Sequence, residues 1–163
     1  PCVVMRRFQH NLFAVNRKAG IQEPKDLEGK RVGVRAYTQT TGVWLRGILE
    51  RDYGVDFRKI TWITYEGAHV SEYKDPEWVA RAPEGKTLAG MLASGEIDAA
   101  IGPGKVDSPD VQPLWPNVAE VEADWYSRTG LYPVNHMVVV KSELAAAHPD
   151  LMRKLFQAFT SSR

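Results

Sequence analysis

Two histidines, His10 and His136, have the clearest potential for chemistry, because each stands directly before an apolar run. The runs are residues 11–15 and 137–140, and their aliphatic, β-branched composition is typical of buried strands. Histidine changes its charge near neutral pH, so two imidazoles at the same end of neighbouring strands can move protons to and from a ligand. The pair therefore predicts two arms of one site.

Each histidine also has a simpler interpretation, as a structural residue with satisfied ring nitrogens at the edge of the core. The functional interpretation depends on the pair and on two neighbours in sequence, Arg7 and Tyr132. Together these side chains suit a ligand with two carboxylates. His69 lies beside two glutamates, but their spacing fits no standard metal site, and no metal site is predicted.

A polar loop, residues 36–42, contains Tyr37 and three threonines and leads from a predicted strand into a predicted helix. The amide groups of a helix N-terminus attract anions, and the hydroxyls of Thr40 and Thr41 add donors, so a carboxylate is a natural ligand. Ordinary capping of the helix by either threonine is the alternative. Arg46, one turn further on, can turn toward this site and hold a carboxylate, or it can remain an exposed helix arginine.

The aromatic residues differ in their predicted roles. Trp44 and Trp62 are expected in the core, whereas Trp125 and Tyr126 precede the second histidine and are candidates to face an aromatic ligand. The glycines match neither a P-loop nor a dinucleotide fingerprint, so no phosphate cofactor is predicted.

Composition excludes several classes of function. The chain has 163 residues and a formal net charge of +1, with acids and bases interspersed, which gives no electrostatic basis for nucleic-acid binding. No apolar run approaches the roughly 20 residues that a membrane span needs. A single cysteine, Cys2, allows no internal disulfide. Because the chain starts at Pro1 and stops just after a helical pattern, we expect it to be a segment of a longer protein.

Strand and helix patterns alternate along the chain, which favours a mainly parallel sheet covered by helices. The strand patterns expected at the centre of the sheet are residues 30–34, 60–64 and 97–101. Helical patterns end at Tyr53, before Gly54, and cover Thr87 to Ser94 and Pro149 to Ser161. Residues 117–121 are expected to form an edge strand, and residues 66–84 an excursion over a surface or over the mouth of a binding site.

The two strands that follow the histidines flank this α/β unit in sequence, as expected for a lobe inserted between two crossing strands. The expected organisation is a hinge strand and connection in 1–28, a second lobe in 29–124, and a return hinge strand with a helix in 125–163. Ligands of open α/β sheets bind beyond the carboxyl ends of the strands. Here those ends are residues 35–41, 64–67 and 102–104.

Several segments resemble those of known proteins over nearly the whole chain. The run from Gly29 to Val34, the run from Gly95 to Ala100 and the helix after His148-Pro149 resemble the type II periplasmic-binding-protein fold. More narrowly, the sequence resembles the 4,5-dihydroxyphthalate decarboxylase family in Arg7-Phe8-Gln9-His10, in Tyr37 through Gly47, and in Thr129 through His136. It departs from the family pattern at Gln9 and Asn135, which leaves open a relative that acts on another aromatic acid.

The resemblance implies an α/β, type II periplasmic-binding-protein-like fold in which this segment holds the second lobe and two hinge-crossing strands. It also implies non-oxidative removal of one carboxyl group from a dihydroxylated aromatic diacid, by a cytoplasmic homo-oligomer that needs no cofactor. On this hypothesis the catalytic residues are His10 and His136, and the substrate-binding residues are Arg7, Tyr37, Thr40, Thr41, Arg46 and Tyr132.

Two other classes of function remain open at this point. The same anion site and hinge strands suit a periplasmic solute-binding protein that delivers an aromatic or sulfonated acid to an uptake transporter. A regulatory ligand-binding domain is a third alternative.

Overall fold

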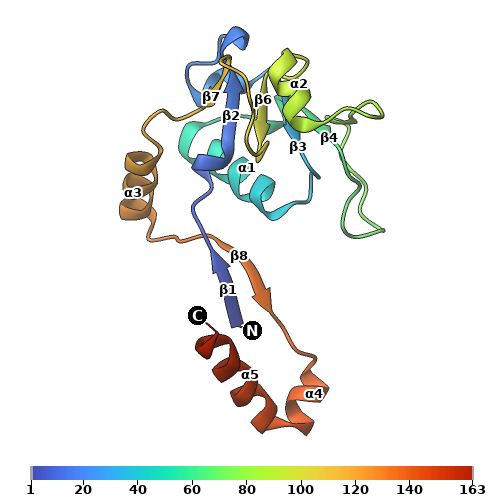
Figure 1. Cartoon of the computed structure of the whole chain (residues 1–163), viewed down its shortest axis with the longest axis vertical. Coiled ribbons are helices and arrows are strands. Elements are labelled where there is room, and N and C mark those ends of the chain that lie inside the picture. Colours follow the sequence, from blue (N-terminus) through green and yellow to red (C-terminus); the bar gives the residue numbers. More distant parts are fainter. Residues whose placement is uncertain (1, 163) are drawn as a thin grey trace. The chain divides into compact units, whose positions relative to one another are not determined.

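The structure is a computed structural model that describes residues 2–162, and it divides into two compact units (Figure 1). The larger unit comprises residues 8–131, and the smaller unit combines residues 2–7 with 132–162. The larger unit therefore extends beyond the expected lobe of 29–124 at both ends.

A six-stranded sheet forms the centre of the larger unit, in the order β5-β4-β3-β6-β2-β7. Neighbours from β5 to β6 are parallel, whereas β2 runs antiparallel to both β6 and β7. The expectation of an α/β fold with a mainly parallel sheet is thus confirmed. The strands are β2 (Phe13–Asn16), β3 (Arg31–Val34), β4 (Thr61–Thr64), β5 (Val79–Arg81), β6 (Ala99–Ile101) and β7 (Val111–Pro113).

Helices connect the parallel strands and end at residues that the sequence marks clearly. Both α1 (Thr40–Tyr53) and α2 (Leu88–Ser94) end before glycines with positive φ, Gly54 at 64° and Gly95 at 79°. The third helix is α3 (Val118–Thr129), and short 3-10 turns are η1 (His10–Leu12), η2 (Arg17–Ala19), η3 (Pro24–Leu27) and η4 (Phe57–Lys59).

The core lies on both faces of the sheet, because successive side chains of a strand point to opposite faces. Val32 and Val34 belong to the larger apolar cluster, together with Leu45 and Leu49 of α1. Gly33, between the two valines, faces the other cluster, where an added Cβ would lie only 2.4 Å from Leu88 Cδ1. This close packing of α2 on the sheet requires a residue without a side chain.

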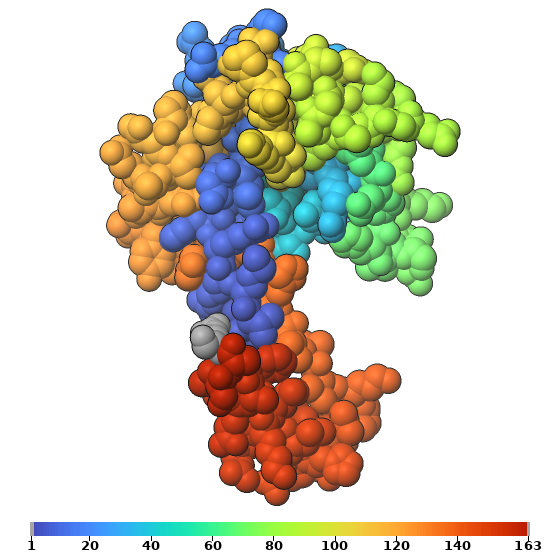
Figure 2. Space-filling model, in the orientation of Figure 1, coloured from blue at the N-terminus to red at the C-terminus, as the bar shows by residue number. Residues whose placement is uncertain are grey.

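One prediction about local structure in this unit is wrong, and a second is incomplete. Residues 117–121 do not form an edge strand, since α3 begins at Val118 with Asn117 at its N-cap. The apolar residues of this segment recur at helical spacing, at Val118, Val121 and Trp125. Residues 117–121 alone are too few to show this period. The predicted surface excursion, residues 66–84, is mostly exposed (Figure 2), but it also contributes the edge strand β5.

The smaller unit contains an antiparallel pair of strands, β1 (Cys2–Arg6) and β8 (Val134–Val138), followed by α4 (Ser142–Ala147) and α5 (Pro149–Ser161). The helix predicted at 149–161 is confirmed, whereas β1 and α4 had no clear pattern. The prediction that residues 137–140 are buried on both faces is wrong, because Met137 is 49% and Val139 69% exposed. Among the described residues, β8 pairs with β1 alone.

No described helix in either unit is long and apolar enough to cross a membrane. The hinge role of β1 and β8 stays a prediction.

Candidate functional site

The predicted site residues fall into two groups, one in each compact unit. The larger unit holds His10, Tyr37, Thr40, Thr41 and Arg46, and the smaller unit holds Arg7, Tyr132 and His136. The structure brings together Tyr37, Thr41 and Arg46 around the start of α1, and it brings together Arg7 and Tyr132 at the end of the β1–β8 pair.

Arg46 is the most informative member of the first group, because its charged side chain is only 9% exposed. The guanidinium lies over the Tyr37 ring, with Cζ 3.8 Å from the ring centroid, and 5.5 Å from the centroid of Trp62. Nη2 donates a hydrogen bond of 2.9 Å to the backbone carbonyl of Tyr37. The alternative of an exposed helix arginine is therefore wrong: the aromatic rings and the carbonyl draw the side chain inward.

The other guanidinium nitrogen of Arg46, Nη1, is buried and has no hydrogen-bond partner within residues 2–162. Burial lowers the pKa of this guanidinium, although an arginine keeps its charge at neutral pH. A buried, charged donor without a partner is costly, and a bound carboxylate would supply the missing acceptor. This nitrogen is the strongest indication of an anion site in the larger unit.

Tyr37 and Gly42 hold the guanidinium in place from two sides. The Tyr37 hydroxyl accepts a 2.9 Å hydrogen bond from Trp78 Nε1, which fixes the ring under Arg46. A Cβ added to Gly42 would lie 3.2 Å from Arg46 Nη1 and 3.3 Å from Val34 Cγ2, so glycine leaves room for the arginine to fold back along α1. Trp78 lies in residues 66–84, the predicted excursion, where no pattern in the sequence marked it as part of a site.

The threonines occupy the first turn of α1, directly beyond the carboxyl end of β3. The N-cap residue is Gln39, so the predicted alternative of capping by Thr40 or Thr41 is wrong. Thr41 is buried, whereas Thr40 is exposed. The first amide groups of an α-helix have no intrahelical acceptor and carry partial positive charge. The Arg46 guanidinium folds back toward the first turn of α1, to 3.2 Å from a Cβ added at Gly42, so its positive charge lies near the start of the helix.

The sequence predicts that His10 stands directly before a strand. His10 lies instead in η1, and β2 begins only at Phe13. Its ring is fully buried, edge-on to Trp115 and Trp125 at centroid distances of 5.0 and 5.7 Å. Neither ring nitrogen has a hydrogen-bond partner in the described part of the chain. Burial lowers the pKa of His10, with Asp52 opposing this shift, so the imidazole is held in its neutral form.

In the smaller unit, His136 is exposed and lies within β8, opposite Met5 of β1, rather than before the strand. The amide of Arg7 donates to the carbonyl of Pro133 at 3.2 Å, and the Tyr132 hydroxyl donates to the carbonyl of Arg6 at 3.5 Å. These bonds continue the β1–β8 pairing and keep Arg7 and Tyr132 close together.

The predicted aromatic candidates lie on α3, where Trp125 is buried and Tyr126 half exposed. Trp62 is in the core as predicted, whereas Trp44 is only partly buried. No cluster of histidine, cysteine, aspartate and glutamate side chains that could hold a metal ion occurs within residues 2–162.

The sequence is similar to known proteins along its whole length. A family described as NMT1/THI5 like matches residues 2–162. The chain is 39% identical over 175 residues to a 4,5-dihydroxyphthalate decarboxylase of Comamonas testosteroni, an alignment that covers 100% of the chain and 53% of that protein. It is 37% identical over 138 residues to a 4,5-dihydroxyphthalate decarboxylase of Pseudomonas putida, covering 77% and 54% respectively. The chain thus spans about half the length of these curated relatives.

Proposed function

Because this chain belongs to the NMT1/THI5-like family, and two similar proteins are named 4,5-dihydroxyphthalate decarboxylase, we propose that the full-length protein is an aromatic-acid decarboxylase. Its substrate would be a dihydroxylated aromatic diacid such as 4,5-dihydroxyphthalate, and its products protocatechuate and carbon dioxide. The observation in this chain that carries the proposal is the buried guanidinium of Arg46, whose Nη1 lacks a hydrogen-bond partner within residues 2–162.

The reaction sets three requirements that can be stated from its chemistry. A proton must reach the ring carbon that bears the leaving carboxylate, which needs a positioned acid. The bond to that carboxylate then breaks, carbon dioxide leaves, and the bonding electrons return to the ring, whose hydroxyls accept charge in the transition state. The retained carboxylate must be anchored so that the leaving one is correctly oriented. The ring acts as its own electron sink, so the scheme needs no organic cofactor.

Anchoring of a carboxylate is the role that we assign to Arg46, assisted by Thr41 and the N-terminus of α1. Tyr37 supports this role, because its ring and its backbone carbonyl both hold the guanidinium in place. A charge-assisted hydrogen bond from Nη1 would satisfy the buried donor only in the ligand complex. Substrate binding would therefore remove an unfavourable feature of the free protein.

Proton delivery is assigned to His136, because it is the more accessible of the two predicted histidines. The enclosed, neutral ring of His10 favours a packing or positioning role over contact with the substrate. Arg7 and Tyr132, which lie close together at the end of the strand pair that carries His136, stay candidates for substrate contacts.

The test is a steady-state assay of the full-length protein with 4,5-dihydroxyphthalate, measuring released carbon dioxide and protocatechuate. Arg46→Gln should raise KM at least about tenfold, since a charge-assisted contact contributes roughly 1.5–3 kcal/mol. The matched control is Arg58→Gln, which removes an exposed arginine paired at the surface with Asp56.

His136→Ala should lower kcat by about 100-fold or more, the usual contribution of a general acid. Activity within a few-fold of the original protein would remove His136 from catalysis. Binding of the diacid without any release of carbon dioxide would overturn the enzyme assignment and favour the solute-binding alternative.

A further inference from the structure

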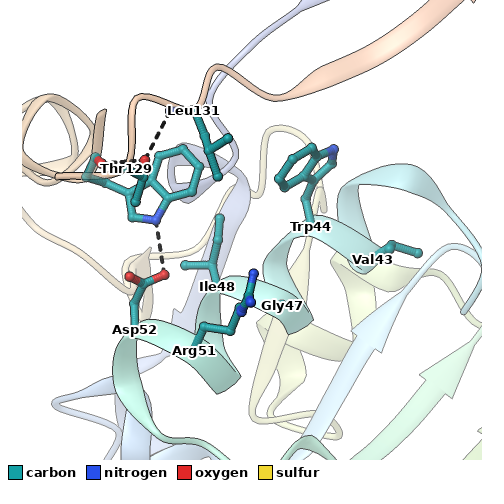
Figure 3. Close-up of a pocket in the computed structure, with 9 residues that line it drawn as sticks. Val43, Trp44, Gly47, Ile48, Arg51, Asp52, Thr129 and Leu131 are labelled. Carbon is teal, nitrogen blue, oxygen red and sulfur yellow. Dashed lines mark hydrogen bonds between the residues drawn. The ribbon is translucent and has the colours of Figure 1, made fainter. Parts of the chain in front are cut away.

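A pocket of about 420 Å³ lies between α1 and α3 in the larger unit (Figure 3). None of the residues assigned above to catalysis or substrate binding lines it. Its volume falls within the usual range of small-molecule sites, roughly 300–1,000 Å³. The side chains that matter for its chemistry are those of Trp44, Ile48, Arg51, Trp125 and Leu131, with Gly47 between them.

One wall of this pocket is held rigidly. Trp125 is 3% exposed, and its Nε1 donates a 3.0 Å hydrogen bond to Asp52 Oδ2. The other oxygen of Asp52 accepts from Arg128 Nη1 at 3.3 Å. The Asp52 carboxylate is thus already neutralised by groups of the protein, and it is not available to repel an anionic ligand.

Gly47 forms the floor, and its position in the middle of α1 is unusual. Glycine in a helix interior is less favourable than alanine by roughly 1 kcal/mol. A Cβ added at Gly47 would meet nothing within 4 Å, so packing inside the chain does not require glycine here. At Gly42, by contrast, an added Cβ would lie within 3.3 Å of the side chains of Arg46 and Val34. An occupant of the pocket that approaches the helix backbone would account for the missing side chain.

Arg51, one turn after Gly47, supplies the only formal charge of the pocket lining that the described residues leave unpaired. No hydrogen bond or ion pair joins it to another residue within 2–162, and its side chain is exposed. Figure 3 shows this side chain running back along α1 beside Gly47. The pocket therefore combines two indole rings, an open floor and one available guanidinium.

We infer that this pocket binds an aromatic monocarboxylate, with its ring over Gly47 between Trp44 and Trp125 and its carboxylate on Arg51. Stacking on the indoles and burial against Ile48 and Leu131 favour a flat apolar group. A single guanidinium without a second cation favours one carboxylate over two. The inference does not rest on the proposed function, because it uses no residue of the Arg46 site.

The test is isothermal titration of the full-length protein with 2-naphthoate, compared with the uncharged 2-naphthamide. We expect saturable binding of naphthoate to the original protein. The affinity for naphthoate should be at least tenfold lower in Arg51→Gln. The uncharged 2-naphthamide should bind to this variant at least as tightly as to the original protein. Gly47→Leu should abolish binding by filling the space over the helix. Gly47→Ala is its matched control, because one methyl group leaves most of the pocket open.

Arg46→Gln distinguishes this pocket from the proposed substrate site, and it should leave naphthoate binding within about twofold. Absence of naphthoate binding, or binding lost in Arg46→Gln and kept in Arg51→Gln, would overturn the inference. So would a Gly47→Leu variant whose naphthoate affinity is unchanged while its oligomeric state shifts, since the pocket would then be a contact between copies. Thermal unfolding of each variant checks that the fold is retained.

Discussion

The replacement Arg46→Met separates a ligand-binding role of this arginine from a structural one. Methionine has a similar length and can fill the space beside Tyr37 and Trp62, but it carries neither charge nor donors. If Arg46 only stabilises the fold, its replacement should strongly lower the free energy of unfolding. If it binds a ligand, the replacement should change the stability of the free protein little but abolish ligand binding.

The magnitudes follow from the contacts of the guanidinium. Methionine removes a charge-assisted hydrogen bond to the Tyr37 carbonyl, worth about 1.5–3 kcal/mol, and a cation–π contact worth about 0.5–2 kcal/mol. It also removes Nη1, a buried, charged donor that has no partner in the described part of the chain and whose burial costs about 1–3 kcal/mol or more. The opposing terms leave a net destabilisation of about 1–2 kcal/mol.

Two measurements on the full-length protein decide the question: urea unfolding and the KM for 4,5-dihydroxyphthalate. We expect a loss of about 1–2 kcal/mol in unfolding free energy and a KM raised at least about tenfold. Arg58→Met, at an exposed surface pair, should change neither. A loss of more than about 4 kcal/mol with KM unchanged would refute the reasoning and make Arg46 a structural residue.

Three further predictions concern the rest of the chain. Because burial lowers the pKa of His10 below 6.5, the unfolded chain binds a proton that the native state does not, so stability should fall as pH drops from 6.5 toward the native pKa. His10→Phe should flatten that slope in urea unfolding at several pH values, and an unaltered slope would contradict the neutral assignment. Gly33→Ala should destabilise the protein, since its Cβ would lie 2.4 Å from Leu88 Cδ1. Adding Leu88→Ala should recover part of that loss, whereas strictly additive losses would mean that no clash exists. The Glu28 carboxyl should titrate by NMR with a pKa of about 2, mainly because of the hydrogen bond from Lys25. Its stabilising effect should be complete above pH 4.5 and lost as pH falls toward 2, and Lys25→Met should raise the pKa.

Local patterns in the sequence predict much of the α/β unit. The three central strands and the ends of α1 and α2 agree with the expectations, because strand composition and glycines at left-handed positions act over a few residues. The same local reasoning fails at residues 117–121, because the helical period of α3 shows only over a stretch longer than five residues. It also misses β1, whose residues pair with residues 128 to 136 positions later in the chain.

The sequence by itself determined the family resemblance, the three central strands of the sheet and the residue types available for chemistry. Only the tertiary structure decided where the side chains of those residues lie and what they contact. It buried Arg46 against Tyr37 and left one guanidinium nitrogen without a hydrogen-bond partner among residues 2–162, although an arginine on a helix is usually exposed. It enclosed His10 between Trp115 and Trp125, which lie 105 and 115 residues later in the chain, and this burial lowers the pKa of the imidazole. Burial and charge depend on contacts between distant segments, and no local pattern encodes them.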